Sequence, residues 1–328
     1  MYRKTLILNN RQVKKLIDMP SVLKVVEDVF RSHAKGLVQM PPKIYLHLDK
    51  YSGDFRAMPA YIQRQKVSGL KWVNVHPKNR RFGLPAVMAV IILSDPKTGF
   101  PLAVMDGTEI TNLRTGAAGG IAAKFLARKN SSVIALVGCG VQARTQLLAL
   151  KELFRIEKVF IWGCKPQHAK KFLKDMRYLG LSIEIKQNIA DCVKDADIIA
   201  TTTPSRKPIV KFEWIKKGVH INAIGADAKG KEELDPKILK NARIVVDDKR
   251  QAAHSGEINV PLSKGLLKER NIYAELGQII NGKKKSRVKN DEITVFDSTG
   301  LAIQDMAVAD YVYKKALKHK IGRLIGIV

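Results

Sequence analysis

Residues 132–146, SVIALVGCGVQARTQ, constrain the fold more than any other part of the chain. An apolar, β-rich run ends at Gly138, and the sequence GCGVQA leads into a helical pattern. This order is typical of the strand, glycine turn and helix of a dinucleotide-binding fold, with Ala143 in place of the third glycine. We expect Gly138 to permit the tight turn, Gly140 to let the backbone approach a pyrophosphate, and the helix N-terminus to attract its charge. Because the turn begins at residue 138, a separate structure must occupy the residues before it.

The balance of charge is unusual, since 58 Lys and Arg against 30 Asp and Glu give a net charge of +28. Such a charge attracts nucleic acid or anionic substrates. The basic residues are scattered, however, and aromatic residues make up only 6% of the chain, so that no stacking platform lies among them. A lysine-rich solvated surface is therefore favoured, and a nucleic-acid site is the alternative.

Targeting signals and metal motifs are absent from the sequence pattern. No apolar run reaches the roughly 18 residues that a membrane span requires, and MYRKTLILNN lacks the apolar core of a signal peptide. The spacing of Cys139, Cys164 and Cys192 is not that of a metal site or a redox pair. We therefore expect a cytoplasmic protein with no bound metal and no membrane partner.

The periodicity indicates an α/β chain with two domains. Residues 10–36 have the pattern of two helices, and residues 43–105 alternate as the strands of a mostly antiparallel sheet do, which makes the first domain α+β. A helix rich in small residues is expected at 108–128. Strands then alternate with helices at 142–154, 166–178 and 188–195, which is typical of a doubly wound parallel sheet; the strands are expected at 132–137, 158–162, 182–186, 197–202, 219–224, 243–247 and 293–297. We expect the domains to comprise residues 1–118, completed by 301–328, and a Rossmann-type domain of residues 119–300.

The end of the second Rossmann strand bears on the choice of nucleotide. NAD-binding folds commonly place Asp or Glu there, where the carboxylate binds the ribose hydroxyls. This strand ends in Gly163, Cys164 and Lys165, and the lysine suits a 2′-phosphate. We therefore expect NADP to be preferred over NAD, unless Lys165 is simply solvated.

Five segments spread in order over nearly the whole chain resemble the ornithine cyclodeaminase/mu-crystallin family: GLKWVNVHPKN (69–79), NLRTGAAGG (112–120), GCGVQA (138–143), INAIGADAKGKEELD (221–235) and FDSTGLAIQD (296–305). Within the family, GDFRAMPAYI and VVDDKRQAAHSGEINVPL are most similar to the archaeal-type alanine dehydrogenases. The resemblance implies a nicotinamide-dependent reaction of an α-amino acid or its imine. It also implies a homodimer, with substrate binding and dimerisation assigned to the first domain.

Two basic residues suit this chemistry. Arg114 stands where the first domain enters the small-residue helix, and its guanidinium suits bidentate binding of a substrate carboxylate, which is its role in the family. The alternative is a surface arginine at the start of a helix. Lys71 interrupts an apolar strand, where a lysine most often points into solvent, but the family places it in the substrate site. A desolvated lysine has a lowered pKa and can carry protons.

Arg56 distinguishes between the activities of the family. The matching position in ornithine cyclodeaminases carries a glutamate that suits the distal amino group of ornithine. An arginine repels that group and suits a small carboxylate instead. Lys43 stands where cyclodeaminases have another substrate-binding arginine. A cation is therefore kept at position 43, with weaker bidentate capacity, and Arg56 favours alanine dehydrogenase activity over cyclodeamination.

Asp227 follows an expected parallel strand, at the carboxyl edge where doubly wound sheets bind ligands. In the family the matching aspartate carries the proton at the reacting nitrogen, and Thr299 approaches the substrate; a loop or cap aspartate is the alternative. The motif match gives no role to His76 or His254, which we expect to be structural. The remaining matches are cofactor contacts: Thr115, Gly138, Gly140, Val141, Gln142, Gly163, Cys164, Lys165, Thr203, Ala223, Ile224, Gly225, Lys231 and Ser298.

These residues predict NAD(P)H-dependent reduction of the imine formed from a small 2-oxo acid and ammonia, or the reverse oxidation, with pyruvate and L-alanine as the leading pair. Arg56 and Arg114 are expected to bind the carboxylate, and Lys71 and Asp227 to transfer protons. The alternatives are reduction of a cyclic ketimine such as pyrroline-2-carboxylate, ornithine cyclodeamination with regenerated NAD, and a non-catalytic nucleotide-dependent binder.

Overall fold

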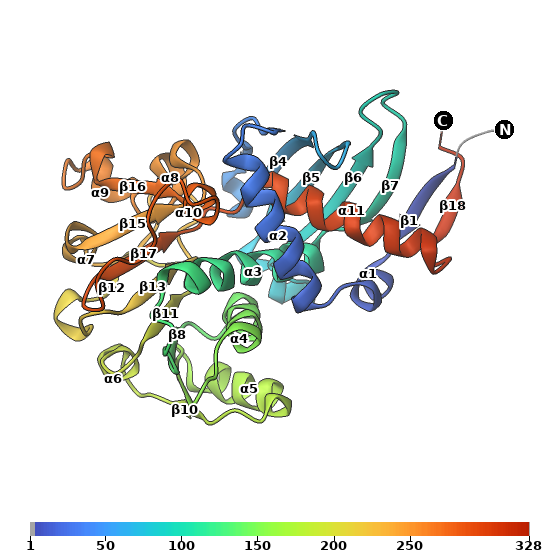
Figure 1. Ribbon diagram of the computed structural model, residues 1–328. Helices are drawn as coiled ribbons and strands as arrows, with labels where there is room; N and C mark the ends of the chain where they lie inside the picture. Colours follow the sequence, from blue (N-terminus) through green and yellow to red (C-terminus); the bar gives the residue numbers. More distant parts are fainter. Residues whose placement is uncertain (1–3, 328) are drawn as a thin grey trace. The chain divides into compact units, whose positions relative to one another are not determined.

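The computed structural model describes residues 4–327, except for the side chain of Arg80. The chain divides into two compact units (Figure 1). The first comprises Met1–Arg114 together with Leu301–Val328, and the second comprises Thr115–Gly300. The expected α/β class is confirmed, because one unit holds a mostly antiparallel sheet and the other a parallel one.

The first unit is built on a sheet in the order β18-β1-β7-β6-β5-β4-β2, with β3 paired to β4. Neighbouring strands are antiparallel except β1 and β7, which are parallel. A turn at Asp95 joins β6 to β7, and its Gly99 has φ 75°. The strands are β1 (Thr5–Leu8), β2 (Val38–Gln39), β3 (Ile44–Leu48), β4 (Gly53–Ile62), β5 (Val67–Val75), β6 (Val87–Ser94), β7 (Pro101–Asp106) and β18 (Arg323–Ile325).

One face of this sheet is covered by helices (Figure 1). Helix α11 (Ala302–Lys318) lies on β4, β5 and β6 and contacts α2 (Met19–His33). The side chain of Asp18 caps α2 by accepting a hydrogen bond from the Ser21 N–H, and Pro20 lies in the first turn of this helix. The short helix α1 (Asn10–Leu16) precedes it, and α3 (Thr108–Leu126) starts after β7.

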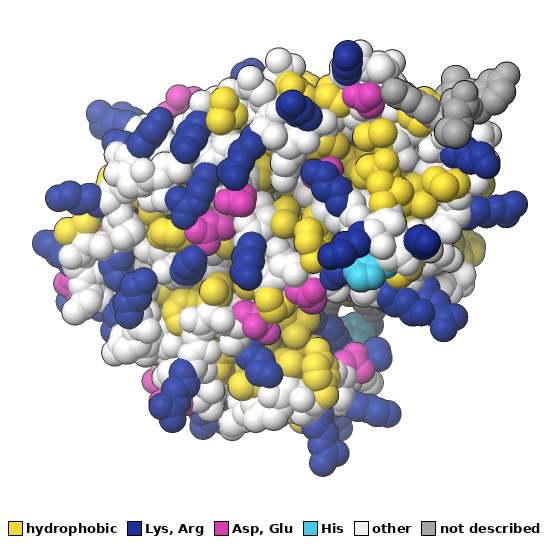
Figure 2. All heavy atoms as spheres, turned by 45° about the vertical axis from the view of Figure 1, so that its right-hand side comes forward, with side chains coloured by type: hydrophobic (Ala, Val, Ile, Leu, Met, Phe, Trp, Pro, Cys, Tyr) yellow, Lys and Arg dark blue, Asp and Glu magenta, His cyan; other side chains and the backbone are white. Residues whose placement is uncertain are grey.

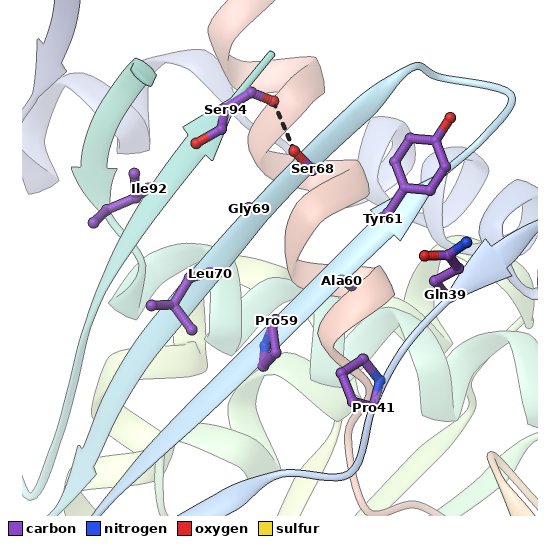
Figure 3. A pocket seen from close by; sticks show the side chains of 10 residues that line it. All are labelled: Gln39, Pro41, Pro59, Ala60, Tyr61, Ser68, Gly69, Leu70, Ile92 and Ser94. Atoms are coloured by element: carbon purple, nitrogen blue, oxygen red, sulfur yellow. Dashed lines mark hydrogen bonds between the residues drawn. The ribbon is translucent and has the colours of Figure 1, made fainter. Parts of the chain in front are cut away.

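The opposite face of the sheet is apolar and exposed. Its exposed side chains alternate with buried ones and come from β3, β5 and β6: Ile44, Leu46, Trp72, Val90 and Ile92. A trough of about 510 Å³ lies on this sheet, lined in part by Pro59, Leu70 and Ile92 (Figure 3). The Ser68 hydroxyl donates a hydrogen bond to the Ser94 carbonyl at its edge. We call this surface the outer face of the first unit.

The second unit holds an all-parallel sheet in the order β10-β9-β8-β11-β13-β17-β15-β16. From β8 the chain runs outward to β9 and β10, then returns to the other side of β8 as β11. The point where the direction reverses lies between β8 and β11, and ligands of such sheets bind there, at the carboxyl ends. The strands are β8 (Val133–Val137), β9 (Lys158–Trp162), β10 (Ile183–Ile185), β11 (Ile198–Thr201), β13 (His220–Ala223), β15 (Ala242–Val246), β16 (Ile272–Glu275) and β17 (Ile293–Asp297).

Helices and a small second sheet complete this unit. Two apolar clusters flank the large sheet, one around Ile199 and Val295 and the other around Leu136 and Leu147. The small sheet pairs β12 (Arg206–Val210) with β14 (Glu232–Leu234). The helices are α4 (Val141–Leu153), α5 (Pro166–Met176), α6 (Ile189–Val193), α7 (Pro236–Asn241), α8 (Lys249–Ser255), α9 (Asn259–Ser263) and α10 (Leu276–Ile280). Short 3₁₀ turns span Asp49–Tyr51, Pro77–Phe82, Arg177–Leu179, Phe212–Trp214 and Glu269–Asn271.

Candidate active site

The predicted glycine turn has the geometry that a dinucleotide needs. Gly138 has φ 113°, and a Cβ there would lie 2.5 Å from Thr202 Oγ1, so only glycine fits without strain. Gly140 precedes α4 and provides no side-chain cap, and a Cβ at Gly140 would meet nothing within 4 Å. The space beside Gly140 is therefore open at the N-terminus of α4, and a helix N-terminus attracts a pyrophosphate.

The ends of the neighbouring strands place the other predicted cofactor residues on the same edge of the parallel sheet. Thr203 follows β11, Ser298 follows β17, and the Ser298 N–H donates to the carbonyl of Ala223 at the end of β13. The Ser298 hydroxyl is buried and has no hydrogen-bond partner among the described residues. An orphaned hydroxyl at this edge fits a cofactor atom. Other predicted contacts at or next to this edge are Val141, Gln142, Gly163, Cys164, Lys165, Ile224 and Gly225.

Asp227 lies in the loop after β13, and its Oδ1 lies 2.5 Å from Nζ of Lys231. The Asp227 side chain is 33% exposed, which leaves it accessible for proton exchange. Thr299 is buried and held by Asp247, which accepts its backbone N–H at 2.7 Å and lies 3.0 Å from its hydroxyl. Thr115, the first residue of the second unit, accepts a hydrogen bond from the Gln146 side chain through its carbonyl.

In the first unit, Lys71 is buried in the sheet. It lies opposite Met58 of β4 and Ile91 of β6, and only 1% of its side chain is exposed, which excludes the alternative of a solvated lysine. Its Nζ lies 2.6 Å from Oδ2 of Asp305 and 3.4 Å from the Thr111 hydroxyl. The lysine is therefore ion-paired inside the unit.

Asp305 also holds Arg114. Its Oδ1 accepts a hydrogen bond from Arg114 Nε at 2.9 Å, and Gln304 Oε1 accepts one from Arg114 Nη1 at 3.2 Å. Arg114 is buried, so it is not the surface arginine of the alternative interpretation. Asp305 thus joins a lysine of β5 to an arginine of α3 through the first turn of α11.

Burial shifts the pKa of Lys71. Desolvation lowers the pKa of Lys71 to about 7, against the opposing effect of the Asp305 carboxylate. The positive charges of Arg114 and Lys43 lower this pKa as well. Lys71 therefore gains and loses a proton near neutral pH, as a proton carrier must.

Arg56 lies on the same face of the sheet as Lys71, because it pairs with Val73, two residues along β5. Its Nε lies 2.8 Å from Asp54 Oδ1, and its guanidinium stacks over the Tyr45 ring at 5.2 Å. Lys43 is half-buried just before β3. The first unit thus brings Arg56, Lys71 and Arg114 together with their acidic partners.

Several functional groups were missed by the sequence analysis. Asp305 stood inside a segment quoted for its resemblance, but an aspartate in the first turn of a helix is usually explained by the helix dipole. Gln304 and Asp247 also stood inside segments quoted for their resemblance, but no role was predicted for either residue. His76 bonds to Asn74 and lies edge-on to Phe55, at a centroid distance of 5.3 Å.

The described residues also bear on metal binding and on membrane insertion. Within residues 4–327, no group of His, Cys, Asp or Glu side chains is arranged to hold a metal ion. In the same range, no helix combines the length and the apolar character needed to cross a membrane.

Comparisons with known proteins agree on one family. The model of the ornithine cyclodeaminase/mu-crystallin family matches residues 3–320. The alanine dehydrogenase of Archaeoglobus fulgidus is 54% identical over 98% of this chain and 98% of its own length. The structure of an archaeal alanine dehydrogenase dimer with bound NAD superposes with a TM-score of 0.95, at 53% identity over 99% of this chain and 100% of that one. The Δ1-pyrroline-2-carboxylate reductase of Thermococcus litoralis, in complex with NADH and L-proline, also has a TM-score of 0.95, at 40% identity over 97% of this chain and 99% of that one.

Proposed function

The chain belongs to the ornithine cyclodeaminase/mu-crystallin family, and from this premise we propose that it is a nicotinamide-dependent amino-acid dehydrogenase. It interconverts a small 2-oxo acid plus ammonia with the corresponding amino acid, and pyruvate and L-alanine are the leading pair. The observation that carries the proposal is the buried cluster of Lys71, Asp305 and Arg114, in which a lysine that titrates near neutral pH lies beside an arginine.

Each part of this reaction has a residue suited to it. Arg114 and Arg56 bind the substrate carboxylate, since both guanidinium groups are buried in the first unit and offer paired N–H donors. Lys71 moves a proton at the substrate oxygen while the imine forms, and Asp227 moves one at the nitrogen. Thr299 contacts the substrate. When bound, the nicotinamide would supply or accept the hydride. The glycine turn would hold the pyrophosphate and the Ser298 hydroxyl another atom of the nucleotide, with Thr115, Thr203, Gly225 and Lys231 around it.

The residues of the Rossmann-type unit fit either form of the nucleotide, and we propose NADP as the preferred one. Lys165 is exposed beyond the end of β9, where it can pair with a 2′-phosphate. The solved relatives hold NAD or NADH, which makes a direct comparison informative. Measured KM values should be lower for NADPH than for NADH; a tenfold advantage for NADH would contradict this assignment.

We also propose a homodimer that pairs the outer faces of two first units. Five large apolar side chains are exposed on that face, which is unfavourable for a solvated sheet. A Trp72→Glu substitution should then give a monomer in size-exclusion chromatography with light scattering. A wild-type chain that elutes as a monomer would contradict the proposal. We assign substrate binding and dimerisation to the domain of residues 1–118 and 301–328. We assign nucleotide binding to the domain of residues 119–300.

Two smaller proposals complete the assignment. Figure 2 shows Lys and Arg side chains dispersed over the visible face, with apolar and acidic side chains between them, so we assign no nucleic-acid partner to the net charge of +28. Cys164 and Cys192 are free thiols, which supports a reducing location such as the cytoplasm.

A spectrophotometric screen of NAD(P)H oxidation tests the activity. Its arms are 2-oxo acids with ammonium, preformed cyclic imines, and L-ornithine with catalytic NAD. Fastest turnover on pyruvate with ammonium supports the proposal. Faster turnover on pyrroline-2-carboxylate would favour the ketimine reductase, the activity named for the Thermococcus litoralis relative. Proline formation from ornithine without net NADH change would assign the chain to the cyclodeaminases.

A further inference from the structure

A buried glutamate of the second unit holds two of the loops at the proposed nucleotide site. Glu233, in β14, is fully buried. Its Oε1 accepts a hydrogen bond from the Thr203 N–H at 2.6 Å, and its Oε2 accepts one from the Gly225 N–H at 2.9 Å. One carboxylate thereby ties the loop after β11 to the loop after β13.

The second of these loops is shaped around the carboxylate. A Cβ at Gly225 would lie 2.5 Å from Glu233 Oε2 and 2.2 Å from the Thr203 carbonyl oxygen, so the close approach requires glycine. At the far end of the loop, Asn259 accepts the Gly230 N–H at 2.9 Å and donates to the Lys231 carbonyl at 2.9 Å. Asp227 lies between the two attachments, and its partner Lys231 belongs to the second one.

Glu233 is itself held in place by two further buried acidic side chains, Glu257 and Asp297. Glu257 accepts the backbone N–H groups of Glu233 and Leu234, at 2.8 and 2.7 Å. Asp297 accepts those of Glu257 and Ile258, at 2.9 and 3.1 Å. Burial raises the pKa of Glu233 and of Glu257. A fixed side chain of this kind has few alternative positions, so the atoms bonded to it are fixed as well.

We propose that Glu233 is a positioning residue, which holds the loop of Asp227 and Lys231 against the end of β11 and so sets both nucleotide affinity and the alignment of Asp227. The inference rests on the proposed function, because it assigns a purpose to loops that face the nucleotide and the reacting nitrogen. Glu233 touches neither substrate nor nucleotide in this scheme. A misplacement of about 1 Å at a reacting group costs about a hundredfold in rate, so the effect on turnover should be large.

Glu233→Gln is the main variant, since it replaces one of the two acceptor oxygens by an amide N–H₂ that opposes a backbone N–H. Asp197→Asn is the matched control. Asp197 also fixes two backbone N–H groups, those of Ser132 and Val133 at 2.9 and 3.0 Å, but it does so where β8 and β11 begin, at the opposite edge of the same sheet. One oxygen of Asp197 accepts both of these N–H groups, and the other pairs with Arg128 and Lys216. Both substitutions therefore disturb an acidic side chain that anchors backbone N–H groups, and only one of the two lies beside the proposed nucleotide site.

The experiment measures three quantities for each variant: the melting temperature, the Kd of NADH and NADPH by fluorescence titration without turnover, and kcat and KM with pyruvate and ammonium. Both variants should melt earlier than wild type. Glu233→Gln should raise the nucleotide Kd about tenfold and lower kcat about a hundredfold, whereas Asp197→Asn should leave both within about twofold. Nucleotide Kd and kcat that change no more in Glu233→Gln than in Asp197→Asn would overturn the inference.

Two further outcomes remain decisive. If Glu233→Gln does not fold, the fallback variant is Asn259→Ala, which releases the other end of the same loop. A lower kcat in Asn259→Ala, with no larger loss of melting temperature than in Asp197→Asn, supports the inference. A wild-type kcat in Asn259→Ala refutes it. If wild-type protein binds neither nucleotide, the proposed function fails. Normal nucleotide binding by both wild type and Glu233→Gln, with equal kcat, rejects the positioning role alone.

Discussion

Removal of the Asp305 charge should move the titration of Lys71 toward acid pH. Asp305 Oδ2 lies 2.6 Å from Lys71 Nζ inside the first unit, and both side chains are buried. The carboxylate favours the ammonium form of the lysine, while burial favours the neutral amine. In Asp305→Asn only the effect of burial and the repulsion by Arg114 and Lys43 remain, so the pKa of Lys71 must fall below its wild-type value of about 7.

The size of the change follows from the geometry. An opposite charge at such a distance shifts the pKa of a buried group by about one to three pH units, and each pH unit corresponds to about 1.4 kcal/mol. The same substitution removes the acceptor of the Arg114 Nε–H, which should weaken binding of the substrate carboxylate. We therefore expect a higher KM for the 2-oxo acid together with the displaced titration.

The assay is the pH dependence of kcat/KM for oxidation of L-alanine, in which Lys71 acts as a base and must be neutral. Wild-type activity should rise with pH through about 7, and the corresponding rise in Asp305→Asn should lie at least one pH unit lower. Asp54→Asn is the control, since it removes the partner of Arg56 from the same sheet and leaves Asp305 in place. A rise at unchanged or higher pH in Asp305→Asn would refute the reasoning.

Three further predictions concern the second unit. Gly140→Ala should leave the free protein as stable or about 0.4–1 kcal/mol more stable, because φ −79° and ψ −165° suit alanine. The same substitution should weaken NADPH binding in a fluorescence titration, since the methyl group enters the space proposed for the pyrophosphate. An unchanged affinity would contradict that placement of the pyrophosphate. Asp227→Asn should retain nucleotide affinity and lose about 10²–10⁴-fold in kcat, and wild-type turnover would rule out its role. Burial raises the pKa of Asp297 from 3.8 to about 8, so the native state keeps a proton that the unfolded state releases, and stability is lost as pH rises from about 4 to about 8. Asp297→Asn should therefore show a weaker fall of unfolding free energy with pH in urea titrations over that window, and a slope equal to that of wild type would contradict the assignment.

The parts of the fold with local periodicity were predicted well from the sequence. The period-two runs of β4 to β7 lie where they were expected, and so do the strands of the parallel sheet other than β16, because each pattern arises from residues close together in the chain. Strand β16 was not predicted. The glycine turn was equally clear, since Gly138 adopts a φ that only glycine favours. Strands β1 and β18 were not predicted. They are short, and they pair with each other and β7 across long stretches of chain.

Residues of the candidate site differ in the same way, since some stand in segments with a local pattern and others are placed by long-range contacts. Lys71, Arg114 and Asp227 were identified because each stands in a segment with a distinctive pattern. Asp305 was not, because α11 has the pattern of an amphipathic helix, whereas the structure buries every residue of it from Ala302 to Asp310. Glu233 was missed for a related reason, since β14 and its pairing with β12 have no local signal. Long-range pairing and complete burial decide these residues, and neither can be read from spacing alone.

The position of Asp305 near the end of the chain has a consequence for protein synthesis. The first unit is assembled from both ends of the polypeptide, and α11 supplies the counter-charge of Lys71. A nascent chain still on the ribosome can complete the Rossmann-type unit first, because its residues are contiguous. Until α11 emerges, the sheet of the first unit lacks its covering helix and Lys71 lacks its partner. An interrupted translation product would therefore retain a nucleotide-binding fold but no finished substrate site, so it would be able to bind the coenzyme without consuming it.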